Sequence, residues 1–418
     1  MKVAVIGGGS TYTPELVDGF ARLAGAIAIT ELVLVDPDQD RLTVVGPFCQ
    51  RILRRYGSGI ALRWTTSLDD GLDGAGAVLL QLRIGGQAAR QRDETWPLEC
   101  GCVGQETTGA GGLAKALRTV PVVLDIAERA RARAQPGAWI IDFTNPVGIV
   151  TRALLDAGHR AVGLCNVAIG FQRIFAGWFG VDPERVGLGH VGLNHLTWER
   201  SVLVDGTDRL PGLLAENGSE IAALVRVPEP VLRETGTVPS YYLRYYYCHD
   251  AVVAEQRHEP TRAEAVAAIE RKLLDMYADP ELDTKPELLG QRGGAFYSEA
   301  AVALLASLSA DRRDVQVVNV RNAGILPFLT DDAVIEVPAV IGPAGPVPVP
   351  VAPVDPLLRG LIAHVSAYEE LAVRAAVHGG RDRVITTLLA HPLVGQWDLA
   401  VGLTDRLIAE NSAFLSWA

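Results

Sequence analysis

Two segments of the chain combine a thiol, imidazoles and amides where short apolar runs end. The run AVGL is followed by Cys165 and Asn166, and the later segment GHVGLNHLTW carries His190, Asn194 and His195. A thiolate and an imidazole, with amide or water oxygens around them, can hold a divalent cation with open coordination positions. Isolated cysteines and histidines more often only pack in a core, and no zinc-finger spacing is present. The residues alone leave metal binding and packing both open.

A tyrosine-rich segment offers a second kind of chemistry. Residues 239–250 read PSYYLRYYYCHD, with five tyrosines in seven positions, whereas the whole chain has ten. A phenol with a pKa near 10 acts as a base only where a metal or another cation stabilises its phenolate. An aromatic packing cluster is the alternative, and it accounts for most of the five.

A glycine-rich turn opens the chain. The stretch VAVIGGGSTYTPEL predicts a strand that runs into Gly7 and Gly9, followed by a helix that starts near Pro14 with Thr13 as its N-cap. Glycines let the backbone turn tightly and approach a pyrophosphate, which the helix N-terminus favours. The third glycine of the dinucleotide fingerprint is replaced by Tyr12, so a turn without a ligand is the alternative.

An acidic residue follows the next predicted strand, as dinucleotide binding requires. Asp36 ends the stretch ELVLVD, where a carboxylate suits the ribose hydroxyls of NAD better than a 2′-phosphate. The predicted cofactor-binding residues are Gly7, Gly9, Ser10, Thr11 and Asp36.

Arginines cluster after the third of the predicted strands. The segment RIGGQAARQRDE carries Arg83, Arg90 and Arg92, and an arginine beyond the carboxyl end of a strand can hold a phosphate or carboxylate with two hydrogen bonds. The alternative is a solvated start of a helix. The following loop, CVGQETTGAGG, either wraps a ligand or turns a corner.

Alternating strands and helices must position these residues. Apolar runs predict strands, and periodic segments between them predict helices, which is typical of a parallel sheet with both faces covered. The predicted strands are Val3–Ile6, Leu32–Val35, Ala77–Leu82, Trp139–Phe143 and Ala161–Leu164. The predicted helices are Pro14–Leu23, Asp38–Arg55, Leu113–Ala134, Pro146–Ala157, Glu264–Tyr277, Ala295–Ser307, Pro356–Val377 and Arg381–Ala390.

The alternation of short strands and helices ends near residue 170, which predicts two domains. We expect an α/β architecture: a Rossmann-type, doubly wound parallel sheet that binds NAD over residues 1–170, and an α+β domain for substrate, metal and oligomerisation over residues 171–418. The Pro-rich stretch VIEVPAVIGPAGPVPVPV, which starts at Val334, predicts an edge hairpin because prolines disfavour a central strand.

Composition narrows the class of protein. The 418 residues are 49% hydrophobic and carry a formal net charge of -11, with no basic stripe of the kind that nucleic-acid binding needs. The N-terminal apolar run is too short for a signal peptide, and no run reaches the ~18 apolar residues of a membrane span. Five cysteines fit a reducing compartment, so we expect a cytoplasmic protein.

Taken together, nine stretches resemble one family over nearly the whole chain. The matching stretches are VIGGGSTYTPEL, RIGGQAARQRDE, GCVGQETTGAGG, DFTNPVGIV, LCNVAIG, GLNHLTW, YYLRYYY, RGGAFYS and HPLV. They resemble glycoside hydrolase family 4, whose members depend on NAD and a divalent metal. LCNVAIG with GLNHLTW is most similar to the 6-phospho-β-glucosidase branch.

The resemblance implies hydrolysis of 6-phospho-β-glucosides with NAD and a divalent metal, usually Mn²⁺. The implied route is oxidation at carbon 3, metal-assisted deprotonation at carbon 2, elimination of the aglycone, addition of water and re-reduction. It also implies a small phosphorylated disaccharide or aryl glucoside as substrate, and a homodimer or homotetramer.

The resemblance also assigns residues. It makes Cys165 and His195 metal ligands and Tyr242 the base, with Tyr241 as a near alternative in a repeat where the alignment slides easily. The implied substrate-binding residues are Arg90, Asn145, Asn166 and Arg292. Asn166 stands where α-specific relatives carry an acidic aspartate, and a neutral amide there favours the β branch.

Three alternatives remain at this point. A family member could act on another glycoside, such as an α-galactoside, an α-glucuronide or an unphosphorylated sugar. A malate- or lactate-type NAD dehydrogenase would share the N-terminal fold, and a non-catalytic NAD-binding regulator would share it too.

Overall fold

The apolar runs of the first 165 residues form the parallel half of one sheet. In the computed structural model, which describes residues 1–294 and 296–418, six parallel strands stand in the order β3-β2-β1-β4-β5-β6. This is the strand order of a dinucleotide-binding fold, so the predicted parallel α/β architecture is confirmed. The strands are β1 Lys2–Ile6, β2 Glu31–Val35, β3 Ala61–Thr65, β4 Ala77–Leu80, β5 Trp139–Asp142 and β6 Ala161–Gly163.

Helices connect these strands and cover the sheet. Strand residues such as Val3, Val5 and Val33 are fully buried, which explains why the strands read as unbroken apolar runs. The helices of this half are α1 Thr13–Arg22, α2 Gln39–Arg55, α3 Leu68–Leu72, α4 Gly86–Glu99, α5 Gly109–Arg133, α6 Val147–Asp156 and α7 Val167–Phe179.

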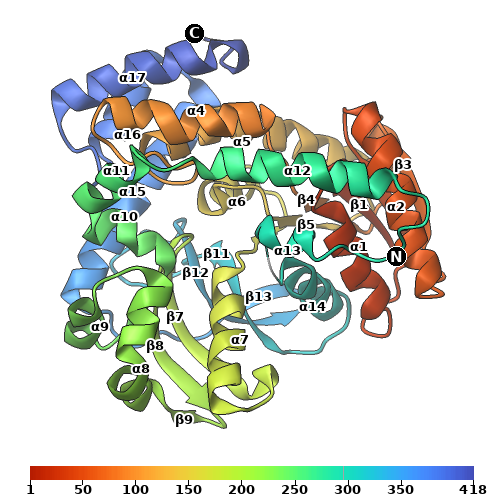
Figure 1. Ribbon diagram of the computed structural model, residues 1–418, viewed down its shortest axis with the longest axis horizontal. Helices are drawn as coiled ribbons and strands as arrows, with labels where there is room; N and C mark the ends of the chain where they lie inside the picture. Colours follow the sequence, from red (N-terminus) through yellow and green to blue (C-terminus); the bar gives the residue numbers. More distant parts are fainter. Residues whose placement is uncertain (295) are drawn as a thin grey trace.

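The sheet continues without a break into an antiparallel half (Figure 1). Strand β6 pairs with β11, and the order runs on through β12, β7 and β8 to β10. The boundary predicted at residue 170 falls inside α7, and the division into two domains stays a prediction. The antiparallel strands are β7 Val186–Leu193, β8 Leu196–Val204, β9 Thr207–Asp208, β10 Val238–Pro239, β11 Val315–Arg321, β12 Val334–Gly342 and β13 Gly345–Pro348.

The predicted edge hairpin is wrong for its first strand. β12 and β13 do form a hairpin, but β12 lies inside the sheet, between β11 on one side and β7 and β13 on the other. β7 pairs with β12 at Glu336, and β13 pairs with the same edge only from Ala339 onward. Pro338 falls between the two partners, where a missing N–H interrupts neither ladder.

The remaining helices pack around the antiparallel half and across the first. Helix α12 contacts both α2 and α4, and it crosses the upper half of the molecule below α4 in Figure 1. The predicted helix 295–307 corresponds to α14, except that Ala295 lies outside the described residues. None of the helices in the described part of the chain has the length and apolar character that a membrane span requires. The helices are α8 Leu210–Val225, α9 Glu229–Thr235, α10 Arg244–Tyr247, α11 His249–Gln256, α12 Arg262–Ala278, α13 Leu288–Gln291, α14 Tyr297–Ser309, α15 Pro356–His378, α16 Arg381–Leu389 and α17 Trp397–Asn411, with 3-10 turns η1 Pro183–Arg185, η2 Tyr241–Leu243 and η3 Ser412–Phe414.

Candidate active site

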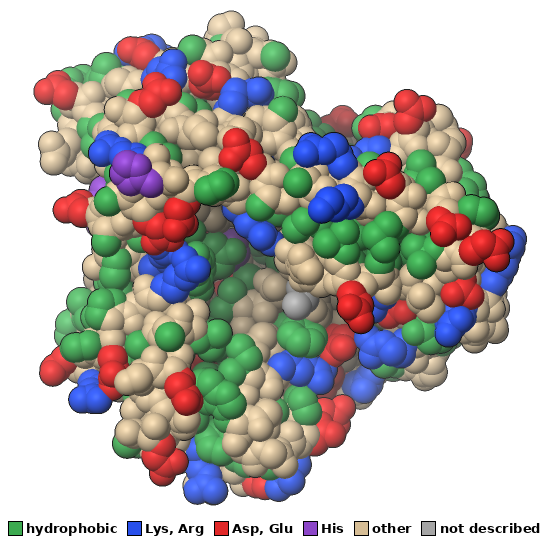
Figure 2. Space-filling view, viewed as in Figure 1, with side chains coloured by type: hydrophobic (Ala, Val, Ile, Leu, Met, Phe, Trp, Pro, Cys, Tyr) green, Lys and Arg blue, Asp and Glu red, His purple; other side chains and the backbone are tan. Residues whose placement is uncertain are grey.

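One cavity of about 810 Å³ gathers most of the predicted site residues. It lies at the carboxyl ends of the parallel strands, where open α/β sheets bind ligands, and Figure 2 shows its hollowed mouth. The predicted residues that line it are Gly7, Ser10, Asp36, Arg90, Asn145, Asn166, His195, Tyr242 and Arg292. Gly9, Thr11 and Cys165 do not line it and lie directly beside residues that do.

The glycine turn forms one end of the cavity. Gly7 has a φ of +86°, and a Cβ there would lie 2.7 Å from the carbonyl oxygen of Gln81, so the turn needs glycine. The prediction that Thr13 caps α1 is wrong. Tyr12 is the N-cap residue and makes no side-chain cap, whereas Thr13 is the first helical residue and its hydroxyl accepts a hydrogen bond from Gln81 Nε2 at 2.8 Å.

Asp36 ties the glycine turn to the second strand. Its carboxylate accepts hydrogen bonds from the backbone N–H of Gly9 at 2.9 Å and of Asp38 at 3.0 Å. Arg41 donates from Nε to the carbonyl oxygen of Gly9 at 2.8 Å. The carboxylate is thereby fixed at the rim of the cavity, at the position from which dinucleotide-binding folds contact ribose hydroxyls.

Thr11 and Arg292 meet behind this turn. The buried Thr11 hydroxyl accepts a hydrogen bond from Arg292 Nε at 2.7 Å, and Arg292 Nη2 pairs with Glu270 at 2.9 Å. Thr11 therefore supports the turn from below. Arg292 does line the cavity, at the end that the glycine turn forms.

The predicted metal ligands lie at the other end, where His195 lines the cavity and Cys165 directly precedes the lining residue Asn166. Cys165 follows β6, and His195 sits with Asn194 in the two-residue turn between β7 and β8, with a φ of +63°. The His195 ring stacks on Tyr242, with ring centroids 3.6 Å apart and planes 6° apart. Burial lowers the pKa of His195 to about 4, so the imidazole is neutral and can act as a ligand.

A short hydrogen-bond chain decides which ring nitrogen of His195 is available. Thr107 Oγ1 lies 2.9 Å from His195 Nδ1 and 2.8 Å from Gln105 Oε1. The amide oxygen of Gln105 can only accept, so the Thr107 hydroxyl donates to it and accepts from His195 Nδ1–H. His195 Nε2 therefore carries the lone pair.

The surroundings of Cys165 suit a thiolate ligand. The backbone amides of Asn166 and Val167, at the N-terminus of α7, and the Asn194 side chain hydrogen-bond its sulfur. Burial nevertheless raises the pKa of the thiol well above its usual value, so the thiolate needs a cation to form.

An open acceptor lies at the same end of the cavity. Within the described part of the chain, the buried Oδ1 of Asn145 has no hydrogen-bond partner. The described residues contain no group of three or more His, Cys, Asp or Glu side chains that could hold a metal. A metal here would have two protein ligands, Cys165 and His195, and would keep positions open for Asn145, substrate or water, as a catalytic site does.

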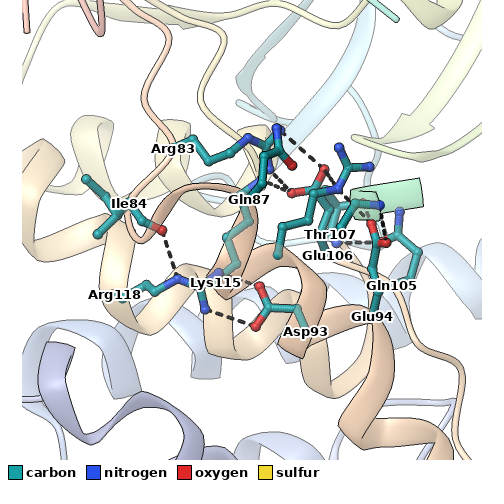
Figure 3. A network of polar contacts seen from close by, with 12 residues as sticks. Arg83, Ile84, Gln87, Asp93, Glu94, Gln105, Glu106, Thr107, Lys115 and Arg118 are labelled. Carbon is teal, nitrogen blue, oxygen red and sulfur yellow. Dashed lines mark hydrogen bonds and ion pairs between the residues drawn. The ribbon is translucent and has the colours of Figure 1, made fainter. Parts of the chain in front are cut away.

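Sequence reasoning missed a buried ion cluster on the cavity wall (Figure 3). Glu106 pairs with Arg83, with Arg90 at 3.1 Å and with Lys115 at 2.6 Å. Burial by itself would raise the pKa of Glu106, but Arg83, Lys115 and Arg90 hold that pKa well below its usual value. Arg90 also pairs with Glu94 at 2.7 Å. The sequence feature that could have indicated this cluster is Glu106, the one charged residue of the segment CVGQETTGAGG.

Arg83 and Arg90 balance the two carboxylates, and burial lowers the pKa of the third cation, Lys115, to about 7, so the cluster carries a partial excess of positive charge near neutral pH. Arg83, Arg90 and Lys115 all line the cavity beside Asn145 and His195, so the excess positive charge faces the space a ligand would occupy. Such a wall attracts an anionic group such as a phosphate.

Comparisons with known proteins agree over both halves of the chain. The model described as "Family 4 glycosyl hydrolase" matches residues 2–180, and "Family 4 glycosyl hydrolase C-terminal domain" matches residues 190–394. A 6-phospho-beta-glucosidase of Escherichia coli (strain K12) is 34% identical over 94% of this chain and 91% of its own.

Solved structures show the same likeness in three dimensions. A 6-phospho-beta glucosidase from Thermotoga maritima with NAD and glucose-6-phosphate superposes with a TM-score of 0.94, at 31% identity over 99% of each chain. Another crystal structure of that enzyme holds manganese, NAD+ and glucose-6-phosphate and superposes with a TM-score of 0.92. A malate dehydrogenase from Aeropyrum pernix has a TM-score of 0.54 at 16% identity over 90% of this chain and 97% of its own, which shows a shared fold alone.

Proposed function

Because the chain belongs to family 4 of the glycosyl hydrolases, we propose that it hydrolyses 6-phospho-β-glucosides with NAD and a divalent metal, Mn²⁺, as cofactors. The observation that carries the proposal is the shared cavity. It joins a dinucleotide-type glycine turn to a neutral histidine stacked on a tyrosine, beside a buried thiol. The relatives whose names state a 6-phospho-β-glucosidase support the choice of substrate.

The glycine turn would bind NAD and the thiol end would bind the metal. Gly7, Gly9, Ser10 and Thr11 would form and support the pyrophosphate turn, while Asp36 would accept from the ribose hydroxyls. When bound, the two cofactors supply reversible hydride transfer at carbon 3 of the sugar and Lewis-acid chemistry at the oxidised carbon.

The metal ligands would be Cys165, through its sulfur, and His195, through Nε2. The hydrogen bonds to the sulfur and the chain from Gln105 through Thr107 support these two assignments. Asn145, with its open Oδ1, would accept from or orient the sugar hydroxyls nearby.

Tyr242 would move the proton at carbon 2. Oxidation at carbon 3 makes that proton acidic, and the phenolate of Tyr242 would remove it while the aglycone leaves carbon 1 with the bonding electron pair. Water would then add its hydroxyl group to carbon 1, its remaining proton would pass to the oxygen of the departed aglycone, and the Tyr242 phenol would return its proton to carbon 2. The Asn166 side chain is a neutral amide with no acidic proton to transfer to the leaving group, which suits a β-linked substrate, and it would bind the sugar instead.

Arg90 and Arg292 would bind the substrate phosphate. Their guanidinium groups line the same cavity, and Arg90 belongs to the cluster that carries the excess positive charge. We also propose that the chain works as a homodimer or homotetramer in the cytoplasm. The five cysteines, all within the described residues, are free thiols.

Release of 4-nitrophenol from its β-glucoside 6-phosphate tests the proposal. Cleavage should need both NAD⁺ and Mn²⁺, and should fall sharply with the unphosphorylated and the α-linked analogues. Cleavage of only one of those analogues would reassign the substrate. Accumulation of NADH with a hydroxy acid, without cleavage of any glycoside, would refute the glycosidase function.

A further inference from the structure

A row of buried polar residues crosses the antiparallel half of the sheet behind the proposed metal ligands. His190 on β7 stands opposite Glu199 on β8, and Glu336 on β12 stands opposite Asn319 on β11. Each of these side chains is at most 1% exposed. Four adjacent strands thus carry a polar seam, and its last member, Asn319, pairs with Gly163 on β6, two residues before Cys165.

The geometry of the seam determines its charge. His190 Nδ1 lies 2.6 Å from Glu199 Oε1, and His190 Nε2 lies 3.0 Å from Glu336 Oε1. Ionised carboxylates only accept hydrogen bonds, so both ring nitrogens carry hydrogen and His190 is an imidazolium. Burial by itself would lower the pKa of His190, but Glu199 and Glu336 raise it to about 10. With both carboxylates ionised, this cluster of three side chains carries one net negative charge.

The second oxygen of Glu336 connects this charge to the metal site. Glu336 Oε2 accepts hydrogen bonds from Asn194 Nδ2 at 3.0 Å and from Asn319 Nδ2 at 2.9 Å. The Asn194 side chain also hydrogen-bonds the Cys165 sulfur, and Asn194 shares the two-residue turn with His195. Glu336 is therefore one contact away from one proposed ligand and holds the turn that carries the other.

We propose that Glu336 is a positioning residue for the metal. It fixes Asn194, and through it Cys165 and His195, and it places a buried carboxylate behind the two ligands. This inference rests on the metal site of the proposed function.

Glu336→Gln tests the inference because it keeps the shape and removes the charge. We expect Mn²⁺ affinity of the full-length chain, measured by electron paramagnetic resonance of free Mn²⁺, to fall about 10- to 100-fold, the usual effect of losing an outer partner of a ligand. With Co²⁺, the thiolate charge-transfer band should still form at saturation, at correspondingly higher concentration. NAD affinity should stay unchanged, because the glycine turn lies at the other end of the cavity.

Asp93→Asn is the matched control. Asp93 is also a fully buried, ion-paired carboxylate, with Arg118 as its partner, but it does not touch the seam. It should lower thermal stability without changing Mn²⁺ affinity. If Glu336→Gln destabilises the chain as the control does but binds Mn²⁺ like the wild type, the seam is only structural and the inference is overturned.

Two further variants keep the test decisive. Asn194→Ala removes the hydrogen bond from Asn194 Nδ2 to Glu336 at a partly exposed position. Its Mn²⁺ affinity therefore tests the same inference if Glu336→Gln does not fold. Cys165→Ser distinguishes an error in the metal site from an error in the positioning role of Glu336. If it binds Mn²⁺ and Co²⁺ like the wild type, the metal site itself is wrong. If it loses them while Glu336→Gln and Asn194→Ala do not, only the positioning role is refuted.

Discussion

Replacing Tyr242 by phenylalanine removes the proposed base and little else. The Tyr242 ring stacks flat on His195, and phenylalanine keeps that ring, so metal binding and folding should persist. Burial raises the pKa of the Tyr242 phenol well above its usual value, while the Arg90 guanidinium lowers it in part. A positioned base contributes about 10²- to 10⁴-fold to a rate. We therefore expect kcat to fall by that factor, which corresponds to about 3–5 kcal/mol of lost transition-state stabilisation.

Tyr241→Phe is the control, because the neighbouring tyrosine has another role. The Tyr241 hydroxyl lies 2.8 Å from Arg244 Nη1, and the guanidinium carbon of Arg244 lies 5.3 Å from the centre of its ring. The hydroxyl is thus already engaged with an ion-paired arginine at the mouth of the cavity. We expect kcat of this variant to stay within a few-fold of the wild type.

Two assays separate the outcomes. Release of 4-nitrophenol reports the full reaction, and loss of deuterium from carbon 2 of the substrate to water reports the proton transfer alone. Tyr242→Phe should lower both rates about 10²- to 10⁴-fold, while the cobalt–thiolate band remains. If Tyr241→Phe is the variant that loses both signals, the base is Tyr241. If both variants retain deuterium exchange at the wild-type rate, neither tyrosine is the base and the reasoning is refuted.

Three other perturbations have defined outcomes. Cys165→Ser should abolish turnover and weaken Mn²⁺ binding while NAD binding, followed by protein fluorescence, stays near the wild-type value; surviving activity would exclude the metal site. Thr107→Val should weaken Mn²⁺ binding roughly tenfold, because His195 Nδ1 loses the acceptor that leaves Nε2 free; unchanged titrations would contradict the inferred tautomer. Burial lowers the pKa of His391 to about 3 from 6.5, so its neutral form stabilises the fold above pH 6.5 and that contribution is lost as pH falls toward 3. Urea unfolding from pH 7 to pH 4 should show His391→Gln losing roughly 1.4 kcal/mol less per pH unit than the wild type, and equal slopes would contradict the assignment.

Several features were predictable because they depend on local sequence. The strands β1, β2 and β4–β6 are buried on both faces, so each had to be a short unbroken apolar run. Asp36 follows such a run, and a carboxylate at that position is a local signature of dinucleotide binding. The glycine turn needs the positive φ of Gly7, which only a few residue types tolerate.

Other features depend on contacts between distant segments. The interior position of β12 was missed because proline disfavours a central strand. Pro338 is tolerated in β12 because the strand that pairs with this edge changes from β7 to β13 around that residue. The choice between Tyr242 and Tyr241 depends on which side of η2 faces His195, and the repeated tyrosines give no hint of that.

The sequence by itself determined the fold class, the glycine-rich turn after β1 and, through the family resemblance, the identity of the candidate ligands. The tertiary structure decided how these residues are charged and oriented. The sheet brings Glu336 to His190 across 146 positions of sequence, and Glu106 meets three cations that no motif connects. The physical reason is that burial and pairing set a protonation state, and both arise only when strands and loops that are far apart in the chain close around the same cavity.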